Sequence, residues 1–394
     1  MIGVSKLYCA SVEASDPLRY NRKSSRLPSH LLQFSKDKKP VIAWNMTRRC
    51  NLKCLHCYAG SSPDIHPGGM TETEEFALID DLAAFGVPVL LFSGGEPLMH
   101  PRIFDLIEYT VAKGMRAVLS TNGTMISAEY ADILKKLGLS YVGISIDGIR
   151  NTHNKFRCSP SAYDLALDGV ERCMNAGIKV GLRFTITKYN YKEVDSVFDL
   201  LTERNIPRIC LYHLAYCGRG GDIPDAVLDN ETTRKVVDTI IYRTELLYNS
   251  GTNTEVLTVN NHCDGPYLYL KALKEKPEIA EDVLKLLKMN GGNNAGMGIA
   301  CIDWDGNVHP DQFWRNKILG NVREKKFSDI WTDPENHLLC ALRNRKKILE
   351  GRCAACRWLD ICNGNSRARA EAAYGDYTMP DPACYLTDEE IAFQ

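Results

Sequence analysis

Residues 41–58 read V-I-A-W-N-M-T-R-R-C-N-L-K-C-L-H-C-Y: a short β-rich run, then three cysteines within eight residues, Cys50, Cys54 and Cys57. This run is the first of six that alternate with amphipathic helical patterns as far as residue 216, which predicts βαβ units and a parallel sheet. The strands are expected at Val41–Asn45, Val87–Phe92, Arg116–Ser120, Tyr141–Ile146, Lys179–Ile186 and Arg208–Tyr216. The helices are expected at Glu72–Phe85, Ile103–Lys113, Ala128–Leu137, Tyr163–Ala176 and Val194–Arg204. Six units are too few for a closed eight-fold barrel, so the pattern favours an α/β partial (β/α)6 barrel over a doubly wound sheet.

The bulk composition restricts the class of protein. A chain of 394 residues is long enough for a large domain and a smaller one. Its 48 basic and 49 acidic residues nearly balance, which predicts no nucleic-acid or membrane partner. The start of the chain has no apolar signal segment, so a cytoplasmic protein is expected, in which fifteen cysteines indicate metal ligation rather than disulfides. The expected divisions are an extension at 1–40, the barrel at 41–230, a helical connection at 231–298 and a cysteine-bearing domain at 299–394.

The first three cysteines form a candidate metal centre. Thiolates are the usual ligands of iron–sulfur clusters, and three of them leave one iron of a four-iron cube without a protein ligand. An open position is what a catalytic metal centre requires. The competing interpretations are a zinc knuckle completed by His56 and a chance group of buried cysteines.

Polar motifs follow the next three strands at their carboxyl ends, where such sheets bind ligands. These motifs are Ser93–Pro97, Ser120–Gly123 and Ser145–Gly148. Together with the cysteine loop they resemble the CxxxCxxC signature, the GGEP motif and the ribose- and carboxylate-binding strand ends of the radical S-adenosylmethionine (SAM) superfamily. The resemblance implies that SAM binds the open iron of a [4Fe–4S] cluster and is cleaved to a 5′-deoxyadenosyl radical. It also implies a set of SAM-binding residues: Tyr58, Ser93, Gly94, Gly95, Glu96, Pro97, Ser120, Asn122, Ser145 and Asp147.

Two arginines, Arg157 and Arg183, are candidates for the SAM carboxylate, because guanidinium groups bind carboxylates in bidentate fashion. Surface arginines with ordinary salt bridges are the alternative for each.

A second cysteine group, Cys353, Cys356, Cys362 and Cys384, could close a metal site completely. Spacing alone does not separate iron–sulfur from zinc here. The region resembles the SPASM domain that follows many radical SAM barrels, which implies an auxiliary [4Fe–4S] cluster. Two positions where that family has cysteines are Asp311 and Ser366, which leaves Cys301 nearly alone; a further cluster using Asp311 is the less favoured alternative. The remaining cysteines, Cys263 among them, are expected to be buried small apolar side chains.

Only a resemblance that extends over most of the chain indicates the substrate. The start of the chain, the segment Leu27–Lys36 and the tail from His309 to Cys362 are similar to the haem-biosynthetic branch of the superfamily. That similarity implies removal of two acetates from 12,18-didecarboxysiroheme to give iron-coproporphyrin III, with ferredoxin or flavodoxin as electron donor. The alternatives are the haem d1 route, a peptide-modifying maturase and a non-enzymatic electron carrier. Tyr212 and His213, at the end of the sixth strand, are the candidate catalytic residues, with His213 a candidate ligand to the tetrapyrrole iron.

Overall fold

The computed structural model describes residues 1–11, 39–64 and 68–392. The segment Leu27–Lys36, on which part of the haem-branch resemblance rests, lies outside these residues.

The core of the described chain is one curved sheet whose central strands are parallel neighbours in chain order. The predicted partial barrel is confirmed, and each of the six expected strands is present with its ends shifted by no more than three residues. These strands are β2 (Val41–Thr47), β3 (Val89–Gly94), β4 (Arg116–Thr121), β5 (Tyr141–Ser145), β6 (Val180–Ile186) and β7 (Arg208–His213).

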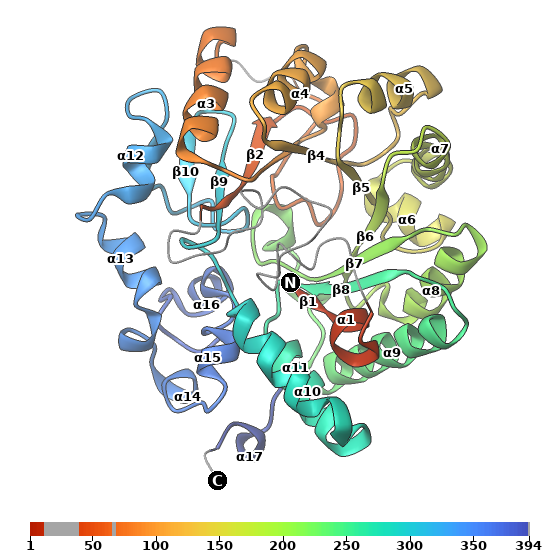
Figure 1. The fold of residues 1–394 in the computed structure, drawn as a ribbon, viewed down its shortest axis with the longest axis vertical. Coiled ribbons are helices and arrows are strands. Elements are labelled where there is room, and N and C mark those ends of the chain that lie inside the picture. The colour runs from red at the N-terminus through yellow and green to blue at the C-terminus, as the bar shows by residue number, and fades with distance from the viewer. Residues whose placement is uncertain (12–38, 65–67, 393–394) are drawn as a thin grey trace.

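Helices cover the outer face of this sheet (Figure 1). They are α3 (Glu72–Phe85), α4 (Ile103–Ala112), α5 (Ala128–Lys136), α7 (Ala162–Asn175) and α8 (Val194–Glu203), with the short α6 (Arg150–Arg157) before α7. The start of α3 is set by a capping box in which Thr71 and Glu74 satisfy each other's backbone N–H groups, as the sequence predicts. Gly86, in the left-handed conformation, ends the same helix.

The sheet extends beyond the barrel strands at both edges. Strand β8 (Glu255–Val259) lies parallel to β7, and β1 (Ile2–Gly3) pairs antiparallel with β8. On the other edge β9 (Ile299–Ile302) is parallel to β2, followed by β10 (Asn307–His309) and β11 (Gly320–Asn321). The sequence pattern predicted only helix for residues 231–298, because β8 is a five-residue run between α9 (Asn230–Asn249) and α10 (Asp264–Glu275).

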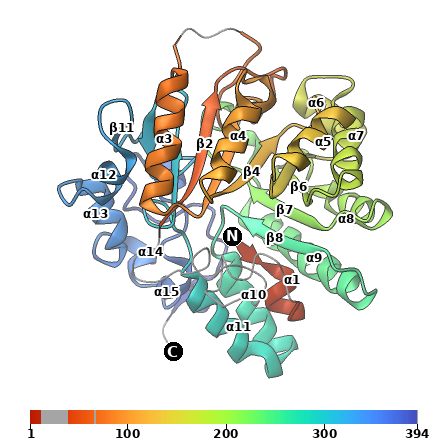
Figure 2. The same ribbon diagram turned by 45° about the horizontal axis from the view of Figure 1, so that its top comes forward.

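The C-terminal region packs beside β9–β11 and against the pair α10 and α11 (Pro277–Asn290) (Figures 1 and 2). The short α15 (Leu359–Cys362) contacts both α10 and α11. Its other helices are α12 (Phe327–Thr332), α13 (His337–Arg343), α14 (Gly351–Ala354), α16 (Arg367–Tyr374) and α17 (Asp388–Ile391). Within the described residues no helix combines the length and the apolar character needed to cross a bilayer.

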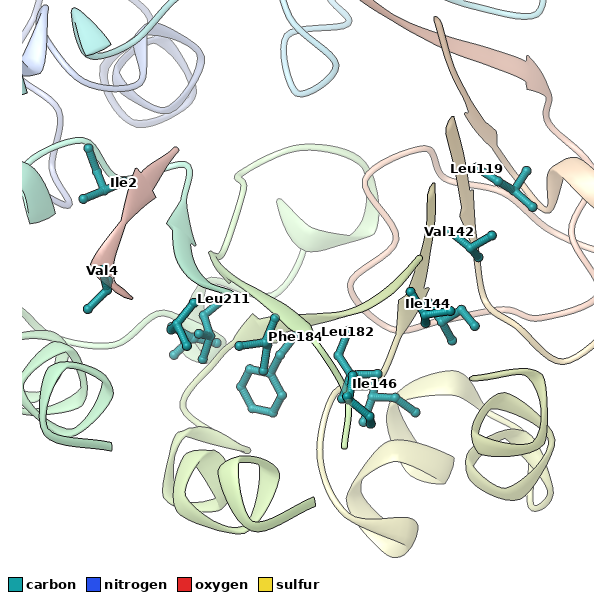
Figure 3. Packing of buried hydrophobic residues seen from close by; sticks show 14 of the residues in the cluster. Ile2, Val4, Leu119, Val142, Ile144, Ile146, Leu182, Phe184 and Leu211 are labelled. Atoms are coloured by element: carbon teal, nitrogen blue, oxygen red, sulfur yellow. The ribbon is translucent and has the colours of Figure 1, made fainter. Parts of the chain in front are cut away.

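The two faces of the barrel sheet have different chemistry. Successive residues of a strand alternate between faces, so one face carries a row of fully buried apolar side chains that pack under the helices (Figure 3). This row includes Leu119, Val142, Ile144, Leu182, Phe184 and Leu211. The opposite, interior face carries the polar side chains, and the site is built there.

Replacing Leu211 by Ala should lower the free energy of unfolding by about 2–5 kcal/mol, because it leaves a cavity in this outer core. Leu211 is 0% exposed, whereas Leu246 on α9 is 44% exposed and provides the same chemical change at the surface. Denaturant unfolding of both variants measures the difference. Equal stabilities for Leu211→Ala and Leu246→Ala would contradict this packing.

Candidate active site

The strand register aligns polar side chains on the interior face. Asn45 is paired with Ser93, Ser120 with Gly143, and Ser145 with Arg183, while Thr185 is paired with Tyr212. Register partners on neighbouring strands share a face. The serines predicted from three separate strand ends therefore line one surface, at the carboxyl end of the barrel.

The cysteine loop follows β2 and is held from several sides. Cys50 and Cys54 are 7% and 6% exposed and pack with Leu52, with Cys57 beside them. Arg219 clamps the loop, because its Nε donates to the carbonyl of Cys54 at 2.7 Å and its backbone N–H to that of Cys57 at 3.0 Å. Arg219 thus fixes the backbone of the loop, with Cys50 and Cys54 buried and Cys57 half-buried.

Burial disfavours ionisation of the Cys50 and Cys54 thiols. Burial raises the pKa of Cys50 to about 12, with the Glu96 carboxylate adding to the shift. Burial also raises the pKa of Cys54, against the opposing charge of Arg157, whose Nη1 lies 3.4 Å from its sulfur. A bound metal deprotonates a coordinating thiol outright. Because burial disfavours the thiolate form, a metal bound here would have to supply the positive charge that stabilises it.

Two glycines allow the end of β3 to lie against this loop. A Cβ atom on Gly95 would collide with the carbonyl oxygen of Arg49, and one on Gly94, whose φ is 126°, would lie 2.5 Å from that of Thr47. The close approach permits hydrogen bonds from Gly95 N–H to Thr47 at 2.6 Å and from Glu96 N–H to Arg49 at 2.9 Å. These glycines therefore couple the cysteine loop to the sheet, whatever else the motif binds.

Glu96 is 0% exposed and its carboxylate bonds to its own chain. It accepts from the Thr121 hydroxyl at 2.7 Å and from the Asn122 and Leu98 N–H groups at 2.9 Å and 3.2 Å. Burial raises the pKa of Glu96 despite these donors. In the described structure this side chain braces the ends of β3 and β4, and its predicted contact with SAM stays a prediction.

Asp147 is likewise fully buried and internally bonded. One oxygen accepts from Thr185 N–H at 2.8 Å; the other pairs with Arg157 and lies 3.2 Å from His56 Nε2. Burial opposes ionisation, but Arg157 and His56 outweigh it and hold the pKa of Asp147 well below its ordinary value. Asp147 thus positions two residues of the cysteine region.

The two candidate arginines differ in their surroundings. Arg157 is already paired with Asp147, whereas the ion pairs among the described residues include none for Arg183. Arg183 donates to Ser120 Oγ at 2.5 Å, and its buried Nε has no partner among those residues. Gly143 has no side chain and so makes room for the Arg183 guanidinium, because a Cβ atom on Gly143 would collide with that group.

The tyrosines lie on the interior side and the candidate histidine does not. Tyr58 bonds to Asn45 and Ser93, both at 2.9 Å, and Tyr212 shares the face of Arg183. His213 is next along β7 and so lies on the opposite face. Its Nε2 is 2.9 Å from Asp264 at the start of α10. The register thus separates the two residues that the sequence grouped together.

The four cysteines of the second group line one small cavity of about 30 Å³. Burial raises the pKa of Cys353, Cys356 and Cys362, while hydrogen bonding from Cys263 lowers that of Cys384 to about 7. Among the described residues, no three His, Cys, Asp or Glu side chains are placed to hold a single metal ion. The four sulfurs therefore share one cavity without forming a single-ion site.

The two departures from the fuller cysteine pattern, Ser366 and Asp311, bond to their own chain. Ser366 caps α16, accepting from the Arg369 N–H at 3.2 Å. Asp311 accepts from the Phe313 N–H at 2.9 Å, and burial raises its pKa. Cys301 is fully buried on β9 and accepts from Asn45 at 3.4 Å. A further cluster on Cys301 and Asp311 stays an untested hypothesis.

Sequence reasoning missed two contributors to this region. Thr121 lies within the Ser120–Gly123 motif, but it acts through a hydrogen bond to Glu96 that only the folded chain creates. Cys263 was assigned as a buried apolar residue, yet it lines the second cavity. Its position one residue before the buried Asp264 is the only local signal, and it is weak.

Comparison with known families matches two parts of the chain. Residues 44–201 match the radical SAM superfamily, and residues 294–357 match the SPASM iron–sulfur cluster-binding domain. These matches support [4Fe–4S] clusters and SAM as the cofactors.

Two relatives align over most of the chain. The chain is 59% identical to an Fe-coproporphyrin III synthase of Methanosarcina barkeri, covering 100% of this chain and 99% of that protein. It is 42% identical to a pre-heme d1 synthase of Dinoroseobacter shibae, covering 89% and 87% respectively. Among solved structures, anSMEcpe with bound AdoMet superposes with a TM-score of 0.68 at 19% identity, covering 88% of this chain and 94% of that one. That likeness concerns the fold alone.

Replacing Gly95 by Ala should displace the loop from Thr47 to Cys50 and strongly reduce the iron bound at the first cysteine group. Gly298→Ala is the matched control, because the nearest atom to its new Cβ would lie 3.4 Å away. Iron and sulfide analysis after anaerobic reconstitution measures the effect. Full iron content in Gly95→Ala would contradict the coupling between the two motifs.

Proposed function

We propose that this chain, which belongs to the radical SAM superfamily, removes two acetate side chains from 12,18-didecarboxysiroheme to give iron-coproporphyrin III. The observation that carries the proposal is the end-to-end identity of 59% with an Fe-coproporphyrin III synthase. The pre-heme d1 synthase at 42% identity supports a shared haem-related branch and is the less favoured assignment. A cytoplasmic location and a ferredoxin or flavodoxin donor are parts of the same proposal.

In this proposal Cys50, Cys54 and Cys57 hold the catalytic cluster. With SAM bound at its open iron, that cluster supplies a 5′-deoxyadenosyl radical. The chain's own contribution is to bury the sulfurs and to hold them: Arg157 donates to Cys54 at 3.4 Å, and Asn122 to Cys50 at 3.8 Å. Glu96 and Asp147 keep these donors in place through their buried carboxylates.

The interior face would receive SAM and the reacting edge of the tetrapyrrole. Arg183 is our choice for a carboxylate partner, because the ion pairs among the described residues include none for Arg183, whereas Arg157 is paired with Asp147. Tyr212 lies on the same face two residues beyond the register partner of Arg183. His213, which bonds to Asp264, is a weaker candidate for contact with substrate or its iron.

The second group, Cys353, Cys356, Cys362 and Cys384, would hold the auxiliary cluster with all four positions filled. A site closed by protein thiolates has no vacancy for substrate, so its chemistry is electron transfer or structural support. We assign it the movement of an electron during ring oxidation.

The test is turnover by the anaerobically reconstituted full-length protein with dithionite, SAM and didecarboxysiroheme. Mass spectrometry should show loss of both acetates from the pigment, with 5′-deoxyadenosine formed. The Cys50/Cys54/Cys57→Ala variant should show neither, because it lacks the open cluster. A product that keeps both acetates but has altered propionates would support the haem d1 route instead. An unchanged pigment without SAM cleavage would refute the proposal.

Arg183→Gln should weaken binding of a carboxylate by about 1.5–3 kcal/mol, roughly ten- to a hundredfold in kcat/KM. Separate KM values for SAM and for the tetrapyrrole identify whose carboxylate it binds. Arg204→Gln, an arginine with 46% exposure, is the control and should behave as wild type. Unchanged kinetic constants in Arg183→Gln would exclude the assigned role.

A further inference from the structure

A fifth cysteine lies at the second cysteine group. Cys263 is 0% exposed and lines the same cavity as Cys353, Cys356, Cys362 and Cys384. It comes from the loop between β8 and α10, about ninety residues before the nearest of the other four. The four ligand positions of a cubane cluster are already filled by the others, so this thiol is present without a coordination role.

The loop that carries Cys263 is anchored on both sides of it. Asn261 donates to the carbonyl of Ala383 at 2.9 Å and accepts from Asn365 at 2.6 Å. Asp264 accepts from the Tyr385 hydroxyl at 2.7 Å. Both anchors reach the segment 383–385, which contains Cys384. The thiol of Cys263 is therefore held at a fixed place beside that cysteine.

The hydrogen-bonding options of Cys263 are few. In the described structure its thiol donates to Asn261 Oδ1 at 3.1 Å, and the carbonyl oxygen of Ala383 is a second, longer acceptor at 3.8 Å. Asn261 Oδ1 already accepts the Asn365 amide. A hydrogen bond to an ionised acceptor is stronger than one to a neutral oxygen. When Cys384 is a cluster ligand, its thiolate is the acceptor that this S–H favours.

We propose that Cys263 is a positioning residue of the auxiliary cluster, a non-coordinating thiol that donates a hydrogen bond to the Cys384 sulfur and raises the cluster's reduction potential. The inference rests on the auxiliary cluster of the proposed function. Hydrogen bonds to cluster sulfurs help to set the potential, because they stabilise the more negative reduced state. A cluster with this donor accepts an electron from the barrel side more readily than one without it.

The experiment is a redox titration of the auxiliary cluster, followed by electron paramagnetic resonance (EPR). It uses full-length protein carrying Cys50/Cys54/Cys57→Ala, so that only this cluster contributes. Cys263→Ala and Cys263→Val are added to that background; valine fills the space of the thiol and protects the fold. Cys263→Ser keeps a donor. Cys173→Ala, at another fully buried cysteine, is the control.

We expect the Ala and Val variants to keep the iron content of the parent and to have a lower reduction potential. The Ser and Cys173 variants should titrate no lower than the parent. An unchanged potential in both Cys263→Ala and Cys263→Val would overturn the proposal, and loss of iron in both would show a ligand instead. If the Cys50/Cys54/Cys57→Ala parent holds no cluster at all, the proposed auxiliary site itself is wrong. Failure of the proposed site is thus distinguished from failure of the role proposed for Cys263.

Discussion

Two backbone hydrogen bonds, from Gly95 to Thr47 and from Glu96 to Arg49, fix the cysteine loop against the sheet. They form only because neither residue 94 nor residue 95 has a side chain to separate the two backbones. The carboxylate of Glu96 then reaches the end of β4, and Asn122 at that end reaches the sulfur of Cys50. A contact between backbones thus sets the place of the buried thiols relative to every strand end.

Burial of charge is the second organising feature. Glu96 and Asp147 are both 0% exposed, and each satisfies its oxygens within the chain. A buried carboxylate without partners would cost several kcal/mol. Here their bonds hold the donors that surround the cysteines, so the polar interior is a rigid frame. Of the two candidate arginines, Arg157 is paired with Asp147, whereas Arg183 has no ion pair among the described residues and is the one left to bind an anion.

Much of the fold could be predicted from the sequence, because the six parallel strands alternate with helices whose apolar patterns are long and regular. The capping box and the terminal glycine of helix α3 can both be identified in the sequence. Strand β8 was missed because five residues between two helices carry no periodic signal. The three-cysteine loop and the second cysteine group were recognisable by spacing. The roles of Glu96, Asp147 and Cys263 were not, since they depend on contacts between residues distant in the chain.

The proposed function requires one open and one closed cluster, and EPR of the reduced protein with and without SAM detects both. The wild type should give two signals, of which only one changes on addition of SAM. That signal should be missing in Cys50/Cys54/Cys57→Ala, while the other persists and ignores SAM. Two signals that both stay unchanged on addition of SAM would show that neither cluster is open. A triple variant without any signal would show that there is no closed cluster.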